Sequence, residues 1–215
     1  MVLEALDKSK FKDNTIVVLV SDHGWQMGEK DYLYKNSPWE RSTRIPIIIK
    51  DPRNSVKNTP VSHPVSLIDI FPTLVDLCQL EGDLTKNEKK FELDGHSLKP
   101  FLNNPNTNRW SGQNGVLTVL GVGVNTPIEG LGYNKNKAAP WHIEIEGDLD
   151  KSYIYKQNYS YRTKDWRYIL YRDGSEELYH TSVDPNEWHN LANDNNFDKE
   201  KISLKAQLTS IINKN

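Results

Sequence analysis

Apolar residues form two kinds of segment in the first half of the chain. Residues 15–20 and 45–49 are short runs dominated by β-branched and aliphatic side chains. Runs of this length that are apolar on both faces are typical of buried parallel strands. Residues 2–11 and 65–80 instead place apolar side chains at helical spacing, and Gly82 follows the second of these segments. The pattern therefore predicts helix, strand, loop, strand and helix, in that order.

Short strand-like segments replace this pattern in the second half of the chain. Asp173-Gly174-Ser175 predicts a hairpin turn between the last two of them. Residues 121–150 are rich in Gly, Asn, Lys and Pro and predict an insertion or a long loop, whereas residues 199–212 have the apolar spacing of a terminal helix. The predicted strands are residues 115–120, 152–162, 166–172 and 177–180.

These elements predict a protein of the α/β class. Residues 1–112 are expected to form the second half of an α/β domain, and residues 113–215 a small antiparallel sheet packed on a C-terminal helix. Cys78 lies in an apolar helical segment and is expected to be a buried core residue without a disulfide partner. The chain begins inside a helical pattern, which suggests that further sequence precedes it.

Composition excludes several classes of partner. The 215 residues carry a formal net charge of −2, so no nucleic acid is expected as a partner. The aromatic segment within residues 153–171 is then expected to be sheet core instead of a base-stacking surface. No stretch approaches the roughly 18 apolar residues of a membrane span. The first residues also lack the basic and apolar blocks of an export signal.

The candidate chemistry lies where the first predicted strand ends. Asp22 and His23 follow it directly, and ligands of open α/β sheets bind at the carboxyl ends of strands. The Asp22 carboxylate suits a hard cation. The His23 imidazole suits calcium less well than zinc, so it either ligates weakly or orients and protonates. We therefore predict that these two residues help bind a metal ion, and the alternative is an exposed turn.

The loop that follows carries candidate substrate contacts. Lys35 lies far enough along this loop to fold back over an anion, although a lysine in a loop can also be simply solvated. Lys30 either contacts substrate or braces the loop through Glu29. The same stretch carries four aromatic residues, Trp25, Tyr32, Tyr34 and Trp39. Their side chains either form an aromatic wall that contacts a sugar ring or pack the loop on itself.

A series of motifs along nearly the whole chain resembles the sulfatase family, in particular the branch similar to iduronate-2-sulfatase and related bacterial sulfatases. The Asp-His-Gly sequence alone is a weak signal, whereas the ordered set is specific. The motifs are Asp13-Asn14-Thr15-Ile16-Val17-Val18, Ser21-Asp22-His23-Gly24-Trp25-Gln26-Met27-Gly28-Glu29-Lys30, Trp39-Glu40 with Thr43-Arg44-Ile45-Pro46, Asp69-Ile70-Phe71-Pro72-Thr73-Leu74, Leu93-Asp94-Gly95-His96-Ser97-Leu98, Tyr161-Arg162-Thr163-Lys164, Trp166-Arg167-Tyr168, Glu177-Leu178-Tyr179, and Asp184-Pro185 with Asn190-Leu191.

The resemblance implies an alkaline-phosphatase-like fold, a calcium ion and a formylglycine nucleophile made in a Cys-x-Pro-Ser-Arg-type motif. It places Asp22 and His23 on the second pair of metal ligands, and Lys35 on the lysine that contacts the sulfate. The nucleophile motif and the first pair of ligands belong to the family's N-terminal half, and Cys78 cannot replace that nucleophile because Gln79-Leu80-Glu81 follows it. Many similar sulfatases carry histidines at the positions of Gln26 and Lys30.

The implied activity is hydrolysis of a sulfate ester on a sugar or related small molecule by the complete protein. The isolated chain is expected to lack activity, and a separate N-terminal half is a candidate partner. One alternative is a phosphohydrolase of the same superfamily with two zinc ions, for which His96 is the candidate additional ligand. Another is a truncated, non-catalytic chain. Similar sulfatases are commonly periplasmic or secreted, although this chain shows no export signal and its compartment is left open.

Overall fold

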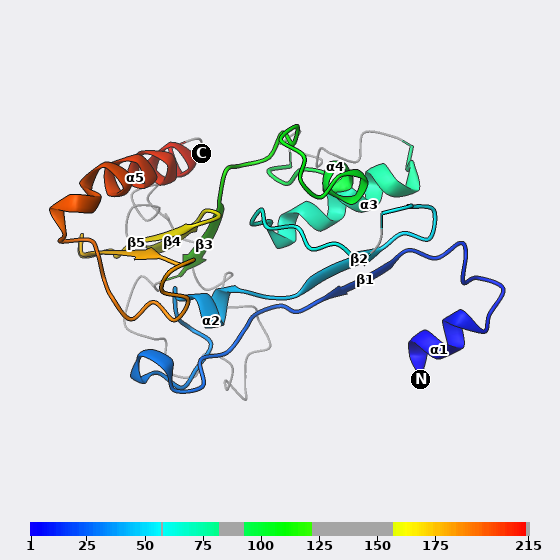
Figure 1. Cartoon of the computed structure of the whole chain (residues 1–215), viewed down its shortest axis with the longest axis horizontal. Coiled ribbons are helices and arrows are strands. Elements are labelled where there is room, and N and C mark those ends of the chain that lie inside the picture. The colour runs from blue at the N-terminus through cyan, green and yellow to red at the C-terminus, as the bar shows by residue number, and fades with distance from the viewer. Residues whose placement is uncertain (57, 82–92, 122–156, 214–215) are drawn as a thin grey trace, which may run out of the picture. The chain divides into compact units, whose positions relative to one another are not determined.

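The computed structural model describes residues 1–56, 58–81, 93–121 and 157–213 (Figure 1). The chain divides into two compact units. Unit 1 comprises Met1–Trp25, Arg44–Val116 and Arg162–Lys164, and unit 2 comprises Gln26–Thr43, Leu117–Tyr161 and Asp165–Asn215. The segment Gln26–Thr43, hereafter the site loop, therefore belongs with the C-terminal sheet, although it follows the first strand of unit 1 in sequence. The division at residue 112 stays a prediction.

Unit 1 contains a pair of strands, β1 (Val17–Val20) and β2 (Ile47–Lys50) (Figure 1). They pair antiparallel, with Leu19 opposite Ile48. These two side chains are 49% and 59% exposed. The expectation of a buried parallel strand is therefore wrong for this pair within the described residues. An apolar run indicates a strand but carries no information on the direction of its neighbour.

The helices of unit 1 are α1 (Val2–Asp7), α3 (Ile70–Cys78), which follows the short turn η2 (Leu67–Asp69), and α4 (Lys99–Asn103). Helix α3 ends at Cys78 because Gln79 adopts a left-handed conformation with φ 52°. Thr73 and Leu77 are its buried residues. Cys78 is exposed, contrary to the prediction, because it lies about 100° around the helix from Leu77.

Unit 2 is built on a four-stranded sheet with the strand order β3-β4-β5-β6 (Figure 1). Strands β5 and β6 form an antiparallel hairpin, and Gly174 in its turn has φ 87°, a conformation that glycine adopts without strain. The sheet and terminal helix confirm the predicted C-terminal architecture. The elements are β3 (Val116–Leu120), β4 (Asn158–Arg162), β5 (Trp166–Leu170), β6 (Glu176–His180), the short turn η5 (Asn195–Phe197) and helix α5 (Asp198–Ile212).

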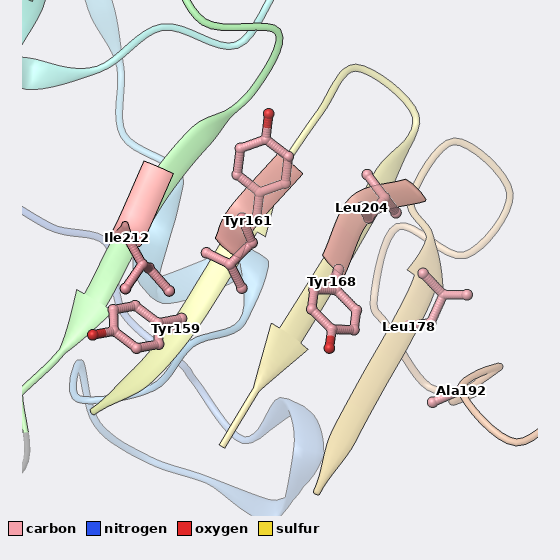
Figure 2. Packing of buried hydrophobic residues seen from close by; sticks show 8 residues of the cluster. Tyr159, Tyr161, Tyr168, Leu178, Ala192, Leu204 and Ile212 are labelled. Atoms are coloured by element: carbon pink, nitrogen blue, oxygen red, sulfur yellow. The ribbon is translucent and has the colours of Figure 1, made fainter. Parts of the chain in front are cut away.

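The core of unit 2 lies between this sheet and α5 (Figure 2). Alternate residues of a strand share one face, which places the rings of Tyr159 and Tyr161 together on β4. The helix contributes Leu204, Leu208 and Ile212, which recur every fourth residue along one stripe. This burial confirms that the aromatic segment is sheet core where it is described.

Replacing Leu208 by alanine is expected to lower the free energy of unfolding by about 2–5 kcal/mol, because this side chain is fully buried and its removal leaves a cavity. Ile202 on the same helix is 66% exposed, so Ile202→Ala should change the free energy of unfolding by only about 0.5 kcal/mol. Urea unfolding of the two variants followed by circular dichroism measures the difference. Equal losses would contradict the packing of α5 on the sheet.

Two predictions of the sequence concern segments that are not fully described. Residues 122–150 of the predicted insertion lie outside the described residues, as do residues 152–156 of the second predicted strand. Among the helices that the structure describes, none has the length and apolar character needed to cross a membrane.

Candidate functional site

Asp22 and His23 form a turn immediately after β1. The Asp22 Oδ1 accepts a hydrogen bond from the His23 backbone N–H at 3.0 Å, and the Ser21 hydroxyl donates to the His23 carbonyl at 3.0 Å. The His23 Nδ1 lies 2.8 Å from the Gly24 carbonyl oxygen. Its Nε2 lies 3.4 Å from the Asp22 Oδ2, and the Asp22 carboxylate is 83% exposed. The end of the strand thus presents an exposed carboxylate beside a partly exposed imidazole.

The Gly24 carbonyl fixes the chemistry of this imidazole. A carbonyl oxygen only accepts hydrogen bonds, so the His23 Nδ1 carries a proton, and in the neutral form of the ring the lone pair is on Nε2. That lone pair and the Asp22 Oδ2 are then two electron-pair donors facing each other. Such a pair is stable when a proton or a cation lies between the two atoms. The arrangement fits two ligands of a metal ion.

The described residues hold no larger cluster of metal ligands. No group of three or more His, Cys, Asp or Glu side chains in the described part of the chain is placed to bind one metal ion. A hard cation such as calcium prefers at least six oxygen ligands in proteins, so Asp22 and His23 supply part of such a shell. The donor set fits the predicted metal incompletely, and the assignment to calcium stays a prediction.

The site loop carries the other predicted residues on a compact turn. The Gln26 N–H donates to the Tyr34 carbonyl and the Gly28 N–H to the Tyr32 carbonyl, both at 3.1 Å. Gly28 has φ 117°, and the short helical turn η1 (Glu29–Asp31) follows it. Lys35 is exposed on this loop, and its contact with sulfate stays a prediction.

The rings of the site loop pack on one another. Tyr32 lies edge-on to Tyr34 and to Trp39, with ring centroids 6.0 Å apart in both pairs. The Tyr32 hydroxyl donates to the Asn36 carbonyl at 2.9 Å. Trp25 belongs to unit 1, where its ring centroid lies 6.4 Å from that of His23. Of the two interpretations left open by the sequence, packing of the loop on itself is observed for Tyr32, Tyr34 and Trp39.

Lys30 is the most constrained of the predicted substrate contacts. Its ammonium donates to the Tyr179 hydroxyl and to the Glu187 carbonyl oxygen, both at 2.7 Å. It also lies 4.5 Å from the centroid of the Tyr179 ring and 5.0 Å from that of Trp39. Glu29, the brace suggested by the sequence, instead accepts from the Met27 N–H and lies 3.7 Å from Arg41. Lys30 therefore contacts the C-terminal sheet region of its own unit.

A buried ion-pair network lies under the end of the site loop. Arg167, which is 1% exposed, donates from Nε to Glu187 and from Nη2 to Glu40, each at 2.5 Å. Its Nη1 donates to the Ser160 hydroxyl at 2.6 Å and to the Pro38 carbonyl at 3.0 Å. Burial raises the pKa of the Glu187 carboxyl, whereas the positive charge of Arg167 acts to lower it. The network fastens Pro38 and Glu40 to the sheet.

Gln26 is buried beneath the same loop instead of facing solvent. It is 1% exposed, and its amide Nε2 donates to the Ser37 hydroxyl at 3.3 Å, which donates to the Ser42 hydroxyl at 2.7 Å. Its amide therefore joins a hydrogen-bonded chain inside the loop.

The predicted site residues fall into two groups. Asp22 and His23 lie together in unit 1, whereas Lys30, Tyr32 and Lys35 lie in unit 2. Sequence analysis assigned no role to Arg167 or Glu177, which fasten the site loop, although each had a recognisable signal. Arg167 is a charged residue within an aromatic strand, and Glu177 lies one position before the buried residue Leu178 on β6.

Known proteins with similar sequences are sulfatases. The family model described as Sulfatase matches residues 1–80. A protein named sulfatase from Formosa agariphila is 31% identical over 207 residues, which cover 96% of this chain and 32% of that protein. Arylsulfatase K of Rattus norvegicus is 31% identical over 215 residues, which cover 99% of this chain and 32% of that protein. The chain therefore spans about a third of the length of these relatives.

A solved structure extends the similarity to the fold. The structure described as a 2-O GAG sulfatase aligns with a TM-score of 0.71 and 26% sequence identity. The alignment covers 99% of this chain and 39% of that one. The alignment therefore includes residues of both units.

Proposed function

Since this chain belongs to the sulfatase family, we propose that it forms the C-terminal part of a sulfatase that hydrolyses sulfate esters. The observation that carries this proposal is the turn after β1, where the His23 Nε2 and the Asp22 Oδ2 face each other at 3.4 Å. This arrangement supports a cation site at the position where the family resemblance expects one. The remaining metal ligands and the formylglycine nucleophile would come from an N-terminal part, either in the same polypeptide or in a separate chain.

Asp22 and His23 would hold one divalent cation, which we propose to be calcium. Bound there, the cation would polarise the sulfate oxygens and stabilise the charge that develops as the S–O bond breaks. The Gly24 carbonyl would leave the His23 Nε2 free to hold the ion, because it keeps the proton on Nδ1. Lys35 is an exposed residue, and its ammonium would neutralise part of the sulfate charge as a point charge.

The substrate class that we propose is a sulfated carbohydrate or a related small molecule. The solved neighbour described as a 2-O GAG sulfatase supports this class. Tyr32 is the candidate ring for contact with a sugar, because it lies on the same loop as Lys35 and next to a second tyrosine, Tyr34. Its hydroxyl already donates to Asn36, so the face of the ring is the surface proposed for the sugar.

The test is hydrolysis of an aryl sulfate by the isolated chain and by the completed protein. With calcium present, the isolated chain should give no turnover because its sequence lacks the Cys-x-Pro-Ser-Arg-type motif that yields the formylglycine nucleophile. Addition of the N-terminal part that carries the Cys-x-Pro-Ser-Arg-type motif should produce calcium-dependent release of sulfate. Measurable hydrolysis by the isolated chain would contradict this division of the site.

The same assay separates the alternatives. A completed protein that prefers an aryl phosphate or phosphonate and requires zinc would be a phosphohydrolase of the same superfamily. A completed protein that folds, binds calcium and hydrolyses none of these esters would be a non-catalytic chain. The sulfatase is supported if the completed protein releases sulfate at least about tenfold faster than phosphate. This ratio corresponds to a difference of about 1.4 kcal/mol between the two activation free energies.

A further inference from the structure

Lys30 belongs to a closed ring of contacts between the site loop and strand β6. Its ammonium donates to the Tyr179 hydroxyl at 2.7 Å, and that hydroxyl donates to the Glu177 Oε2 at 2.8 Å. The indole N–H of Trp39 donates to the same oxygen at 2.8 Å. The ring closes because the Lys30 ammonium lies 5.0 Å from the centroid of the Trp39 ring. Two residues of the loop are thus linked through two residues on one face of β6.

The donors and acceptors of this ring are matched. An ammonium only donates, a phenol hydroxyl both accepts and donates, and a carboxylate only accepts. Burial raises the pKa of the Tyr179 hydroxyl, and the Glu177 carboxylate raises it further, so the hydroxyl keeps the proton that it donates. Two of the three N–H donors of the Lys30 ammonium are used by Tyr179 and Glu187. The ammonium is therefore engaged by the protein in the absence of substrate.

The backbone at Lys30 needs such support. Lys30 has φ 60° and Asp31 has φ 54°, left-handed conformations that are unfavourable for residues other than glycine. Two consecutive residues keep left-handed backbone angles only where surrounding contacts stabilise them. Of the two, Lys30 has side-chain bonds to residues far away in the sequence, with Tyr179 and with Glu187. Its side chain thus holds the turn in a shape that the local sequence does not favour.

Glu187 connects this ring to the buried network at the end of the loop. Its carbonyl oxygen accepts from Lys30, and its carboxylate accepts from the Glu40 backbone N–H at 2.8 Å and from Arg167 at 2.5 Å. One residue therefore receives hydrogen bonds from both sides of the loop. Lys35 lies between these two attachment points in the sequence and is itself exposed.

We propose that Lys30 is a positioning residue, which together with Trp39, Glu177, Tyr179 and Glu187 holds the site loop on the C-terminal sheet and so sets the position of Lys35. The proposal rests on the proposed function for its catalytic consequence, because Lys35 is the residue assigned to the sulfate. The sequence left two roles open for Lys30, substrate contact and bracing of the loop. The proposal assigns it to bracing, and its partners are Tyr179 and Glu187 instead of Glu29.

The variants isolate the ammonium from the rest of the side chain. Lys30→Met keeps the length of the stem and removes the three N–H donors, whereas Lys30→Arg keeps donors for both acceptors. The matched control is Lys205→Met, because Lys205 on α5 donates to Glu176 on β6 at 2.8 Å without contacting the site loop. Trp39→Phe is a second test variant, which removes the indole N–H bond to Glu177 and keeps an aromatic ring.

The first measurement is amide hydrogen exchange in the full chain without substrate or metal. Lys30→Met should speed exchange of the Gln26 and Gly28 amides by about tenfold or more, because the bonds of these amides to the Tyr34 and Tyr32 carbonyls depend on the shape of the loop. Lys30→Arg should restore most of the protection, and Lys205→Met should leave it unchanged. Trp39→Phe should change exchange in the same direction, which keeps the test valid if Lys30→Met does not fold. Unchanged exchange in both loop variants would overturn the proposal.

The second measurement is turnover of an aryl sulfate by the completed protein. Lys30→Met should lower kcat by about tenfold or more, and Lys30→Arg should recover most of this loss. A fall in kcat/KM with unchanged loop exchange would identify Lys30 as a substrate contact and overturn the proposal. Faster loop exchange with wild-type kinetics would also overturn it, because the loop position would then not affect the reaction. If the wild-type protein hydrolyses no sulfate ester, the proposed function fails, and hydrogen exchange still decides whether Lys30 fastens the loop.

Discussion

Replacing Asp22 by asparagine in the completed sulfatase is expected to lower kcat/KM for an aryl sulfate by about a hundredfold or more. A bound metal ion contributes several kcal/mol of transition-state stabilisation. Loss of about 3 kcal/mol corresponds to a factor of about 100 in rate. Asparagine keeps the size of the side chain and one carbonyl oxygen but removes the negative charge that faces the His23 Nε2. The variant should therefore also need a higher calcium concentration for its remaining activity.

Steady-state kinetics across a calcium titration measures both effects. Asp7→Asn is the matched control, because Asp7 is an exposed aspartate of unit 1 that lies 3.7 Å from Lys50 and far along the chain from the turn after β1. Surface pairs of this kind contribute little to stability, so this control should keep the wild-type rate within about twofold. Chelation of calcium should abolish wild-type turnover, and added calcium should restore it. A near-normal rate for Asp22→Asn would remove Asp22 from the proposed metal site.

Local patterns were sufficient to predict most elements of unit 2. The apolar spacing of residues 199–212 predicted helix α5, and Leu208 and Ile212 on that helix are buried, whereas Ile202 is 66% exposed. The Asp173-Gly174-Ser175 turn predicted the β5–β6 hairpin because glycine permits the positive φ found there. These features depend on residues close together in the sequence, whose conformational preferences act without help from the rest of the fold.

The features that could not be predicted depend on contacts between distant segments. The apolar run of β1 indicated a strand, but its antiparallel pairing with β2 is a property of two segments and not of either alone. Residues around Cys78 were apolar in a helical pattern, yet the face that α3 buries is the one that carries Thr73 and Leu77. Periodicity identifies an amphipathic helix reliably. It does not show which residues at the edge of the apolar face are buried against the rest of the protein.

The site loop shows the same limit for function. The resemblance assigned Lys35 to the sulfate, whereas the sequence left Lys30 with two roles, substrate contact or bracing, that it could not separate. The separation comes from Tyr179 and Glu187, which lie far away in the sequence and contact Lys30. Glu187 has φ 58°, a further left-handed residue besides Lys30 and Asp31 at the point where the loop is fastened. A lysine that binds substrate and a lysine that binds the protein have the same sequence signature, so three-dimensional partners are needed to distinguish them.

Lys35→Ala in the completed protein is expected to lower kcat/KM for an aryl sulfate by about 10²–10³, the loss found when one donor to a developing negative charge is removed. The loop itself should stay in place, because the bonds that fasten it come from Lys30, Trp39 and Glu40. Amide exchange of Gln26 and Gly28 should therefore match that of the wild-type chain, which separates this variant from Lys30→Met.

Arg41→Gln is the control for Lys35→Ala, because Arg41 is an exposed cation on the same loop. It lies 3.7 Å from Glu29 and donates to Asn186 at 3.1 Å, contacts that are not expected to affect the reacting sulfate. Its kcat/KM should stay within about twofold of wild type, whereas Lys35→Arg should recover part of the activity by keeping the charge. Equal losses in Arg41→Gln and Lys35→Ala would indicate that the loop acts through its total charge. Because a single ammonium close to the sulfate interacts with it far more strongly than a distant one, the proposed role of Lys35 requires the two variants to differ by at least about tenfold.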